Sequence, residues 1–169
     1  MSVIKLEALA DTIGLANGIQ VPDSRAYRNR NPGELKSFAL LHKQDADEEG
    51  YRIFSSFIGG YRALLHELKV RCSGHGRASV WDGDKNAPKK LSSTSPLKDL
   101  LRTYGMKSEE VVTKTVNFLR KALRDEVISA EIQIGWFVDA PLVPQGEILR
   151  RRVDADAIWL GQSYQPRGE

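Results

Sequence analysis

Apolar side chains near the start of the chain recur every three or four residues. This first stripe consists of Leu6, Leu9, Ile13 and Ala16. The spacing is that of one face of an α-helix. Asn17-Gly18 follows directly, and this pair favours the left-handed backbone conformation in which helices commonly end. The pattern therefore predicts a helix over residues 3–16.

A second stripe predicts a helix that Ser55 or Ser56 caps and that runs to about Cys72. Its buried face consists of Tyr61, Leu64, Leu65 and Leu68. Gly59-Gly60 lies near its start, although glycine weakens a helix by about 1 kcal/mol relative to alanine. We therefore expect another part of the backbone to pack closely against these glycines.

Two further helices are predicted in the second half of the chain. Ser95-Pro96 is a start signal, and Gly105 ends the helix that follows it. Its apolar face consists of Leu97, Leu100, Leu101 and Tyr104. Ser108 caps the next helix, whose first turn is acidic and whose last turn is basic, as the helix dipole favours. Its stripe consists of Val112, Val116, Leu119 and Leu123.

The remaining segments lack a helical period. Residues 51–54 alternate weakly and predict a short strand or an extended arm, whereas residues 73–94 predict a long loop or lid. Residues 127–138 are rich in β-branched and aromatic side chains and predict one or two strands or a packed arm. The predicted fold class is mainly α (α+β), with a helical domain over residues 1–124 and a small β or irregular C-terminal appendage over 125–169, packed on the same domain.

Charge and composition place few limits on the possible functions. The 169 residues carry a net charge of +3, with basic groups at residues 25–30, 85–90 and 150–152. A solvated face explains these groups more simply than a nucleic-acid site does. Cys72 is the only cysteine and His42, His66 and His75 are dispersed, so we expect no disulfide, no metal site and no cofactor.

No apolar run approaches the 18 or so residues of a membrane span, and the first residues lack the features of a signal peptide. We therefore expect no membrane partner. The chain is expected in the cytoplasm as synthesised, unless another route exports it.

Residues 17–35 read NGIQVPDSRAYRNRNPGEL and combine two prolines, two glycines and three arginines in one predicted loop. Residues 50–57 read GYRIFSSF, residues 60–66 read GYRALLH and residues 96–104 read PLKDLLRTY. In this order the blocks resemble the motifs of lysozyme-like peptidoglycan-cleaving domains from phages and bacteria. The first motif of that family runs roughly E-G-x-x-x-P-G-S-R-(A/S)-x-R-N-N-N-P-G-N-(L/I). The resemblance covers about residues 4–124.

This resemblance implies a helical lysozyme-like fold whose first helix ends in a catalytic glutamate, the general acid that protonates the glycosidic oxygen. Asn17 occupies that position here, and an amide has no proton that dissociates near neutral pH. The chain also has Glu34 where the family has asparagine, and Gly105-Met106 where it has Ala-Pro. Loss of the acid predicts weak or absent glycan cleavage.

Glu34 is the one candidate for a relocated acid, because it follows the N-P-G segment on the presumed cleft wall. A surface glutamate paired with Arg28 or Arg30 explains it more simply. The resemblance further implies that the loop binds the glycan strands of peptidoglycan. The predicted substrate-binding residues are Tyr27, Arg28, Asn29, Asn31, Gly33 and Tyr51.

Three functional hypotheses follow. The first is a catalytically degenerate lysozyme-like protein that interacts with peptidoglycan. The second is an active muramidase or lytic transglycosylase that uses Glu34. The third is a recruited scaffold for a protein or nucleic-acid partner, with a protein partner bound through residues 125–169.

Overall fold

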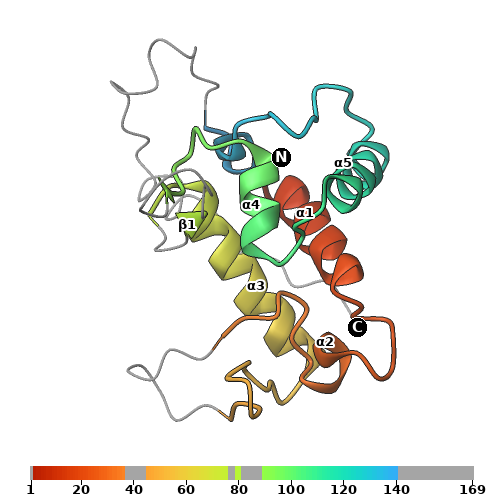
Figure 1. Ribbon diagram of the computed structural model, residues 1–169. Helices are drawn as coiled ribbons and strands as arrows, with labels where there is room; N and C mark the ends of the chain where they lie inside the picture. Colours follow the sequence, from red (N-terminus) through yellow and green to blue (C-terminus); the bar gives the residue numbers. More distant parts are fainter. Residues whose placement is uncertain (1, 37–44, 76–78, 81–88, 141–169) are drawn as a thin grey trace.

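The computed structural model describes residues 2–36, 45–75, 79–80 and 89–140 (Figure 1). Its helices are α1 (Ser2–Ala16), α2 (Arg25–Arg28), α3 (Phe57–Cys72), α4 (Leu97–Thr103), α5 (Glu109–Leu123) and the 3-10 helix η1 (Ile134–Val138). Its strands are the two-residue pair β1 (Ser79–Val80) and β2 (Lys89–Lys90), which run antiparallel. The predicted mainly helical fold class is confirmed.

Helix α1 is the element around which the core is built. It contacts α3, α5 and η1, and Figure 1 shows it lying between α3 and α5. The predicted stripes supply most of the fully buried side chains: Leu9, Ile13, Leu64, Leu68, Leu97, Leu100, Leu101 and Leu119. Cys72 is also buried, as its place among apolar neighbours predicts.

Two of the predicted helix caps are confirmed and one is wrong. The hydroxyl oxygens of Ser56 and Ser108 accept hydrogen bonds from backbone N–H groups in the first turns of α3 and α5. At α4 the capping residue is Pro96, which has no side chain able to accept a hydrogen bond. The hydroxyl of Ser95 instead accepts a hydrogen bond from the N–H of Ser92, at 2.9 Å.

Two glycines match backbone positions that other residues would strain or block. Gly18 has a φ of +83°, in agreement with the predicted end of α1. A Cβ atom built on Gly60 would lie 1.8 Å from the backbone oxygen of Arg30. The expected close packing of another backbone segment is therefore confirmed at Gly60, where the 25–33 loop lies directly on α3, and not at Gly59.

The non-helical predictions fare unevenly. Residues 51–54 form an extended arm with isolated bridges from Tyr51 to Lys36 and from Arg52 to Ala46, so the strand alternative is wrong. Residues 127–138 form turns and η1, and the strand prediction is wrong there as well. The β-branched and aromatic residues that suggested strands fill the core instead; they are Ile128, Ile132, Ile134, Phe137 and Val138.

Some predicted features lie outside the described residues. These are Lys85 of the basic group at 85–90, the basic group at 150–152, His42, and residues 141–169 of the appendage. Within the described part of the chain, no helix has both the length and the apolar character that a membrane crossing requires.

Candidate functional site

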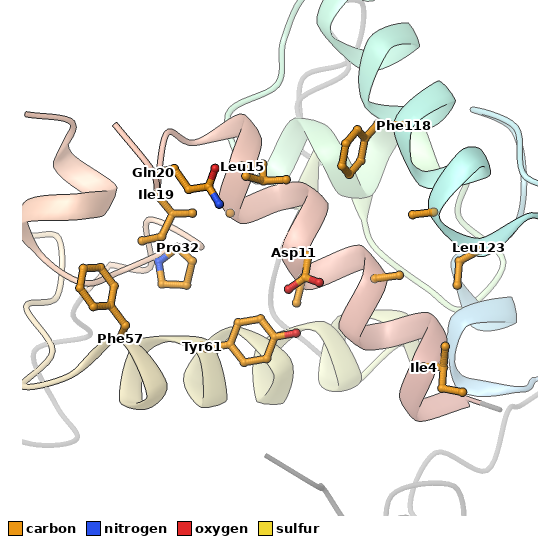
Figure 2. Close-up of a pocket in the computed structure, with 14 residues that line it drawn as sticks. Ile4, Asp11, Leu15, Ile19, Gln20, Pro32, Phe57, Tyr61, Phe118 and Leu123 are labelled. Carbon is orange, nitrogen blue, oxygen red and sulfur yellow. The ribbon is translucent and has the colours of Figure 1, made fainter. Parts of the chain in front are cut away.

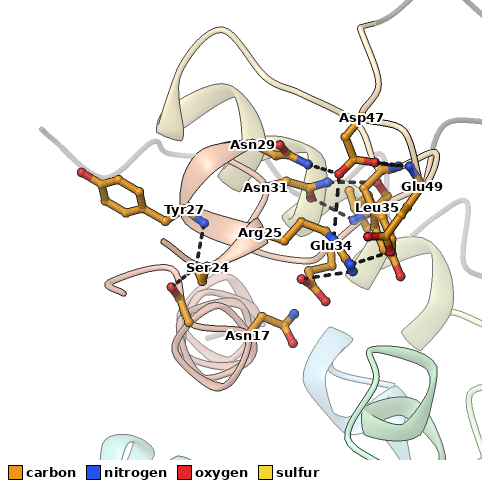
Figure 3. Close-up of polar contacts among 12 residues, drawn as sticks. Asn17, Ser24, Arg25, Tyr27, Asn29, Asn31, Glu34, Leu35, Asp47 and Glu49 are labelled. Atoms are coloured by element: carbon orange, nitrogen blue, oxygen red, sulfur yellow. Dashed lines mark hydrogen bonds and ion pairs between the residues drawn. The ribbon is translucent and has the colours of Figure 1, made fainter. Parts of the chain in front are cut away.

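Asn17 lies directly after the last residue of α1, where its backbone N–H donates to the carbonyl oxygen of Ile13. Its side-chain Nδ2 donates a hydrogen bond of 2.9 Å to the carbonyl oxygen of Pro32. The side chain is half-buried and, in Figure 3, points out from the end of the helix toward the loop. The hydrogen bond ties the end of α1 to the N-P-G segment, although 15 residues separate the two along the chain.

The loop that follows contains a short helix that the sequence pattern did not predict. Ser24 caps α2 by accepting a hydrogen bond from the N–H of Tyr27, and its hydroxyl donates to the carbonyl oxygen of Gly18 at 2.6 Å. A serine before four residues that tolerate a helix was the available signal. The high content of glycine and proline in the flanking residues obscured it.

Two of the predicted sugar-binding amides are committed to the fold. Asn31 is 1% exposed; its Nδ2 donates to the carbonyl oxygens of Leu35 and Arg52, and its Oδ1 accepts from the N–H of Leu35. Asn29 is also buried and donates to a carboxylate oxygen of Asp47 at 2.7 Å. These amides fasten the loop to the 45–54 arm, and their side chains are occupied by contacts within the fold.

Tyr27 and Arg28 are exposed, as are residues 20–23 and Arg30 of the same loop. Tyr27 is 40% exposed and its ring lies against that of Phe57, which is 44% exposed, with 5.5 Å between the centroids. This pair offers an accessible aromatic surface at the start of α3. The sugar-binding role of Tyr27 and Arg28 stays a prediction.

Arg25 organises the acidic side chains around the loop (Figure 3). Its guanidinium lies 2.5 Å from Glu49, 3.8 Å from Glu34 and 3.9 Å from Asp47. It also lies 4.0 Å from the ring centroid of Tyr51. The predicted pairing of Glu34 with Arg28 or Arg30 is therefore wrong, because α2 turns Arg25 toward the carboxylates.

Glu34 has an unusual backbone and an unusual ionisation. Its φ is +47°, a left-handed conformation that few residues other than glycine adopt. Partial burial raises the pKa of its carboxyl above the ordinary value, and the charge of Arg25 opposes this rise. The nearby carboxylates of Glu49 and Asp47 raise the pKa further.

The carboxylate of Asp47 shifts in the opposite direction. Burial alone would raise its pKa, but hydrogen bonds from Asn29 and from the N–H groups of Tyr51 and Glu49 favour the charged form. Together with Arg25 they hold the pKa of Asp47 below its ordinary value. Two carboxyl groups in one cluster thus have pKa values pushed apart by their surroundings.

A cleft of about 270 Å³ lies beside this cluster. One wall is formed by residues 33–36 and Tyr51, and the other by Arg71 of α3 and by residues 102–107 at the end of α4. Of the predicted site residues, Gly33, Glu34 and Tyr51 line the cleft, whereas Tyr27, Arg28, Asn29 and Asn31 lie outside its lining. Asn17 also lies outside the lining, as does Pro32, to which it is hydrogen-bonded.

A larger depression, of about 550 Å³, follows α1 between α3 and α5 (Figure 2). Its lining is mostly apolar and includes the exposed side chains of Ile4, Leu15, Phe57 and Phe118. Asp11 is the only carboxylate among its described lining residues, and none of the predicted site residues belongs to it. Of the two hollows, the polar cleft is therefore the one lined by sequence-based candidates, namely Gly33, Glu34 and Tyr51.

Metal binding finds no support in the described ranges, where no group of three or more His, Cys, Asp or Glu side chains is placed to hold an ion. In comparisons with known proteins, no family model, no curated protein and no solved structure matches this chain. The interpretation of the site therefore rests on its own residues and their geometry.

Proposed function

We propose that this chain is a lysozyme-like protein that interacts with peptidoglycan and whose acid position is degenerate, so that it cleaves glycan weakly or not at all. The observation that carries the proposal is the hydrogen bond from Asn17 to the Pro32 carbonyl oxygen, 2.9 Å long. It joins the end of the first helix to the N-P-G segment, the two features whose proximity the resemblance to lysozyme-like domains implies.

The surroundings of Asn17 suit a protonated acid. A carbonyl oxygen accepts hydrogen bonds and never donates them, so a carboxyl group bonded to Pro32 would have to keep its proton. A hydrogen bond of this kind favours the neutral form and raises a carboxyl pKa. Asn17 makes the same type of hydrogen bond, but its amide cannot transfer the proton, and general acid catalysis is worth about 10²–10⁴-fold in rate.

The exposed surface of the loop and the cleft both support the proposal that the chain binds glycan although it does not cleave it. Tyr27 and Phe57 present aromatic faces on which a sugar ring can stack. Tyr51, by contrast, has Arg25 and Lys36 over its ring, at 4.0 and 4.8 Å from the centroid. Tyr27 is therefore the residue proposed to stack on a sugar ring, whereas the ring of Tyr51 holds cations near the cleft.

A peptidoglycan zymogram tests the proposal. We expect no clearing by the wild-type protein, clearing by Asn17→Glu, and none by Asn17→Gln, which matches glutamate in length but lacks the acidic proton. Co-sedimentation with purified sacculi should show binding by all three proteins. Strong clearing by the wild type, or failure of the wild type to pellet with sacculi, would contradict the proposal.

A second candidate function is active cleavage with Glu34 as the acid. The specific observation in its favour is that Glu34 lines the cleft, is half-buried and has a raised pKa, as a general acid requires. It is also the only carboxylate among the described lining residues, which suits a mechanism with one acid. Clearing by the wild type that Glu34→Gln abolishes and Glu48→Gln preserves would establish this alternative.

The scaffold hypothesis has no comparable observation behind it. Residues 125–140 contribute buried side chains to the core, and residues 141–169 lie outside the described part of the chain. A protein partner bound through residues 125–169 stays a prediction.

A further inference from the structure

The cleft beside Glu34 is lined by an excess of cationic side chains. Lys36, Arg71, Arg102 and Lys107 all belong to its lining, against the single carboxylate of Glu34. They come from three separated parts of the chain: the end of the N-P-G loop, α3, and the end of α4. The fold therefore gathers positive charge that is dispersed in the sequence.

These four cations divide into two pairs. The two arginines are held by carboxylates on their own helices, Arg71 by Glu67 at 3.4 Å and Arg102 by Asp99 at 3.2 Å. The ammonium groups of Lys36 and Lys107 have no ion pair with a carboxylate in the described part of the chain. The arginine pairs are close to neutral locally, so the lysines set the net charge of the cleft.

The cleft lining carries little negative charge. Glu34 is the single carboxylate of the lining, and it lies 3.8 Å from Arg25, which is not a lining residue. Tyr104 also belongs to the lining, but its hydroxyl is buried and offers no accessible polar group to a ligand. Lys36 and Lys107 are both exposed, so their charges are accessible to an anionic group of a ligand.

We infer that this cleft takes a carboxylate-bearing saccharide and discriminates against neutral ones, with Lys36 and Lys107 as the residues that contact the carboxylate. The inference rests on the proposed function and names its ligand class more closely. In peptidoglycan the carboxylates have two sources: the stem peptides, and the lactyl group of muramic acid where the peptide has been removed. A polymer of N-acetylglucosamine has neither.

The test compares three probes by fluorescence anisotropy with the full chain: peptide-bearing glycan strands, strands stripped of peptide by an amidase, and a neutral N-acetylglucosamine oligomer of similar length. We expect both anionic strands to bind more tightly than the neutral oligomer. If the lactyl carboxylate is the ligand group, stripped strands bind best; if the peptide carboxylates are, the peptide-bearing strands do.

The variants are Lys36→Gln, Lys107→Gln and the double variant, with Lys121→Gln on α5 as a control of equal charge change outside the cleft lining. Exposed charge pairs predict a loss of about two- to fivefold in affinity for each lysine removed, multiplied in the double variant. Neutral and anionic strands that bind equally, or a double variant that binds like the control, would overturn this inference alone. Absence of binding to sacculi and to every strand would overturn the proposed function with it.

Discussion

The two ends of α1 belong to regions that are stabilised in different ways. Along most of its length the helix packs against α3, α5 and η1 mainly through apolar side chains, such as Leu9, Ile13 and Leu64. Beyond Ala16 the chain enters a polar region, residues 17–36 and 45–54, in which Asn29 and Asn31 are buried and hydrogen-bonded. Here Arg25 and Asp47 hold segments that lack long regular structure.

The difference has consequences for tolerance to change. An apolar core spreads its stabilisation over many weak contacts, so a substitution that conserves volume costs little. A polar network draws its stabilisation from a few directional hydrogen bonds. Removing one buried amide from it leaves several backbone groups without partners. We therefore expect the polar region to be the more sensitive of the two per atom removed.

The largest effect is expected where the two regions meet. Gly60→Ala would place a Cβ atom 1.8 Å from the Arg30 carbonyl oxygen, a backbone atom that a side-chain rotation cannot move aside. We expect a loss of more than about 3 kcal/mol in the free energy of unfolding, above the usual range for overpacking. Urea denaturation followed by circular dichroism measures it.

Gly59→Ala is the matched control, because the nearest atom to its added Cβ is the side-chain hydroxyl of Ser56, at 3.2 Å. Alanine is the better helix former, so a change of under about 1 kcal/mol in either direction is expected. Equal losses in the two variants would show that helix α3, and not its contact with the loop, sets the cost.

Asn31→Ala is expected to have the next largest effect. It removes three hydrogen bonds and leaves two carbonyl oxygens and one N–H in a buried site without the amide. We expect a loss of about 2–4 kcal/mol of stability, in the range typical of broken buried networks. Amide hydrogen exchange at Leu35 would report the loss locally.

Leu9→Met offers the corresponding test on the apolar side, since it changes shape and conserves most of the volume of a fully buried residue. A cost below about 1.5 kcal/mol is expected. A cost that matched or exceeded that of Asn31→Ala would contradict the contrast drawn between the two regions.

Asn17→Ala should have a smaller effect. It removes one hydrogen bond from a half-buried side chain and leaves the Pro32 carbonyl without that donor. We expect a loss of about 1 kcal/mol. Asn17→Ser, which can still donate but with a shorter reach, serves as the comparison in the same denaturation assay; a gain in stability on removal of the amide would argue that position 17 was kept for binding and not for the fold.

The smallest effect is a pair of opposite pH dependences within the Arg25 cluster. The folded-state pKa of Asp47 is lowered, so its contribution to stability is present above the unfolded value of about 3.9 and is lost as the pH falls through the folded value. The folded-state pKa of Glu34 is raised, so stability falls as the pH rises from the unfolded value of about 4.3 through the folded value.

Denaturation midpoints of the wild type, Asp47→Asn and Glu34→Gln measured across the acidic range separate the two groups. On acidification, the wild type should lose part of its stability advantage over Asp47→Asn. Over the same range it should gain stability relative to Glu34→Gln. Parallel curves for the two variants would rule out the opposed shifts.

Much of the helical architecture could be read from the printed residues because helix signals are local. The stripes over residues 3–16, 57–72 and 109–123 and the capping serines at 56 and 108 each depend on neighbours within a turn or two. The local signal failed where packing decided the conformation. The β-branched and aromatic residues of 127–138 favour a strand, yet their burial against α1 and α3 is achieved by turns and a 3-10 helix.

The same distinction holds for the candidate site: the sequence identified some of its residues, and packing decided their contacts. Residue types and their order were sufficient to single out Asn17, Glu34 and the N-P-G loop, since motif resemblance depends on sequence alone. Only the tertiary structure could join Asn17 to Pro32, turn Arg25 toward Glu34, and bring Lys36 and Lys107 to one cleft. Contacts between residues far apart in the chain depend on how the helices pack, and no local pattern encodes that distance.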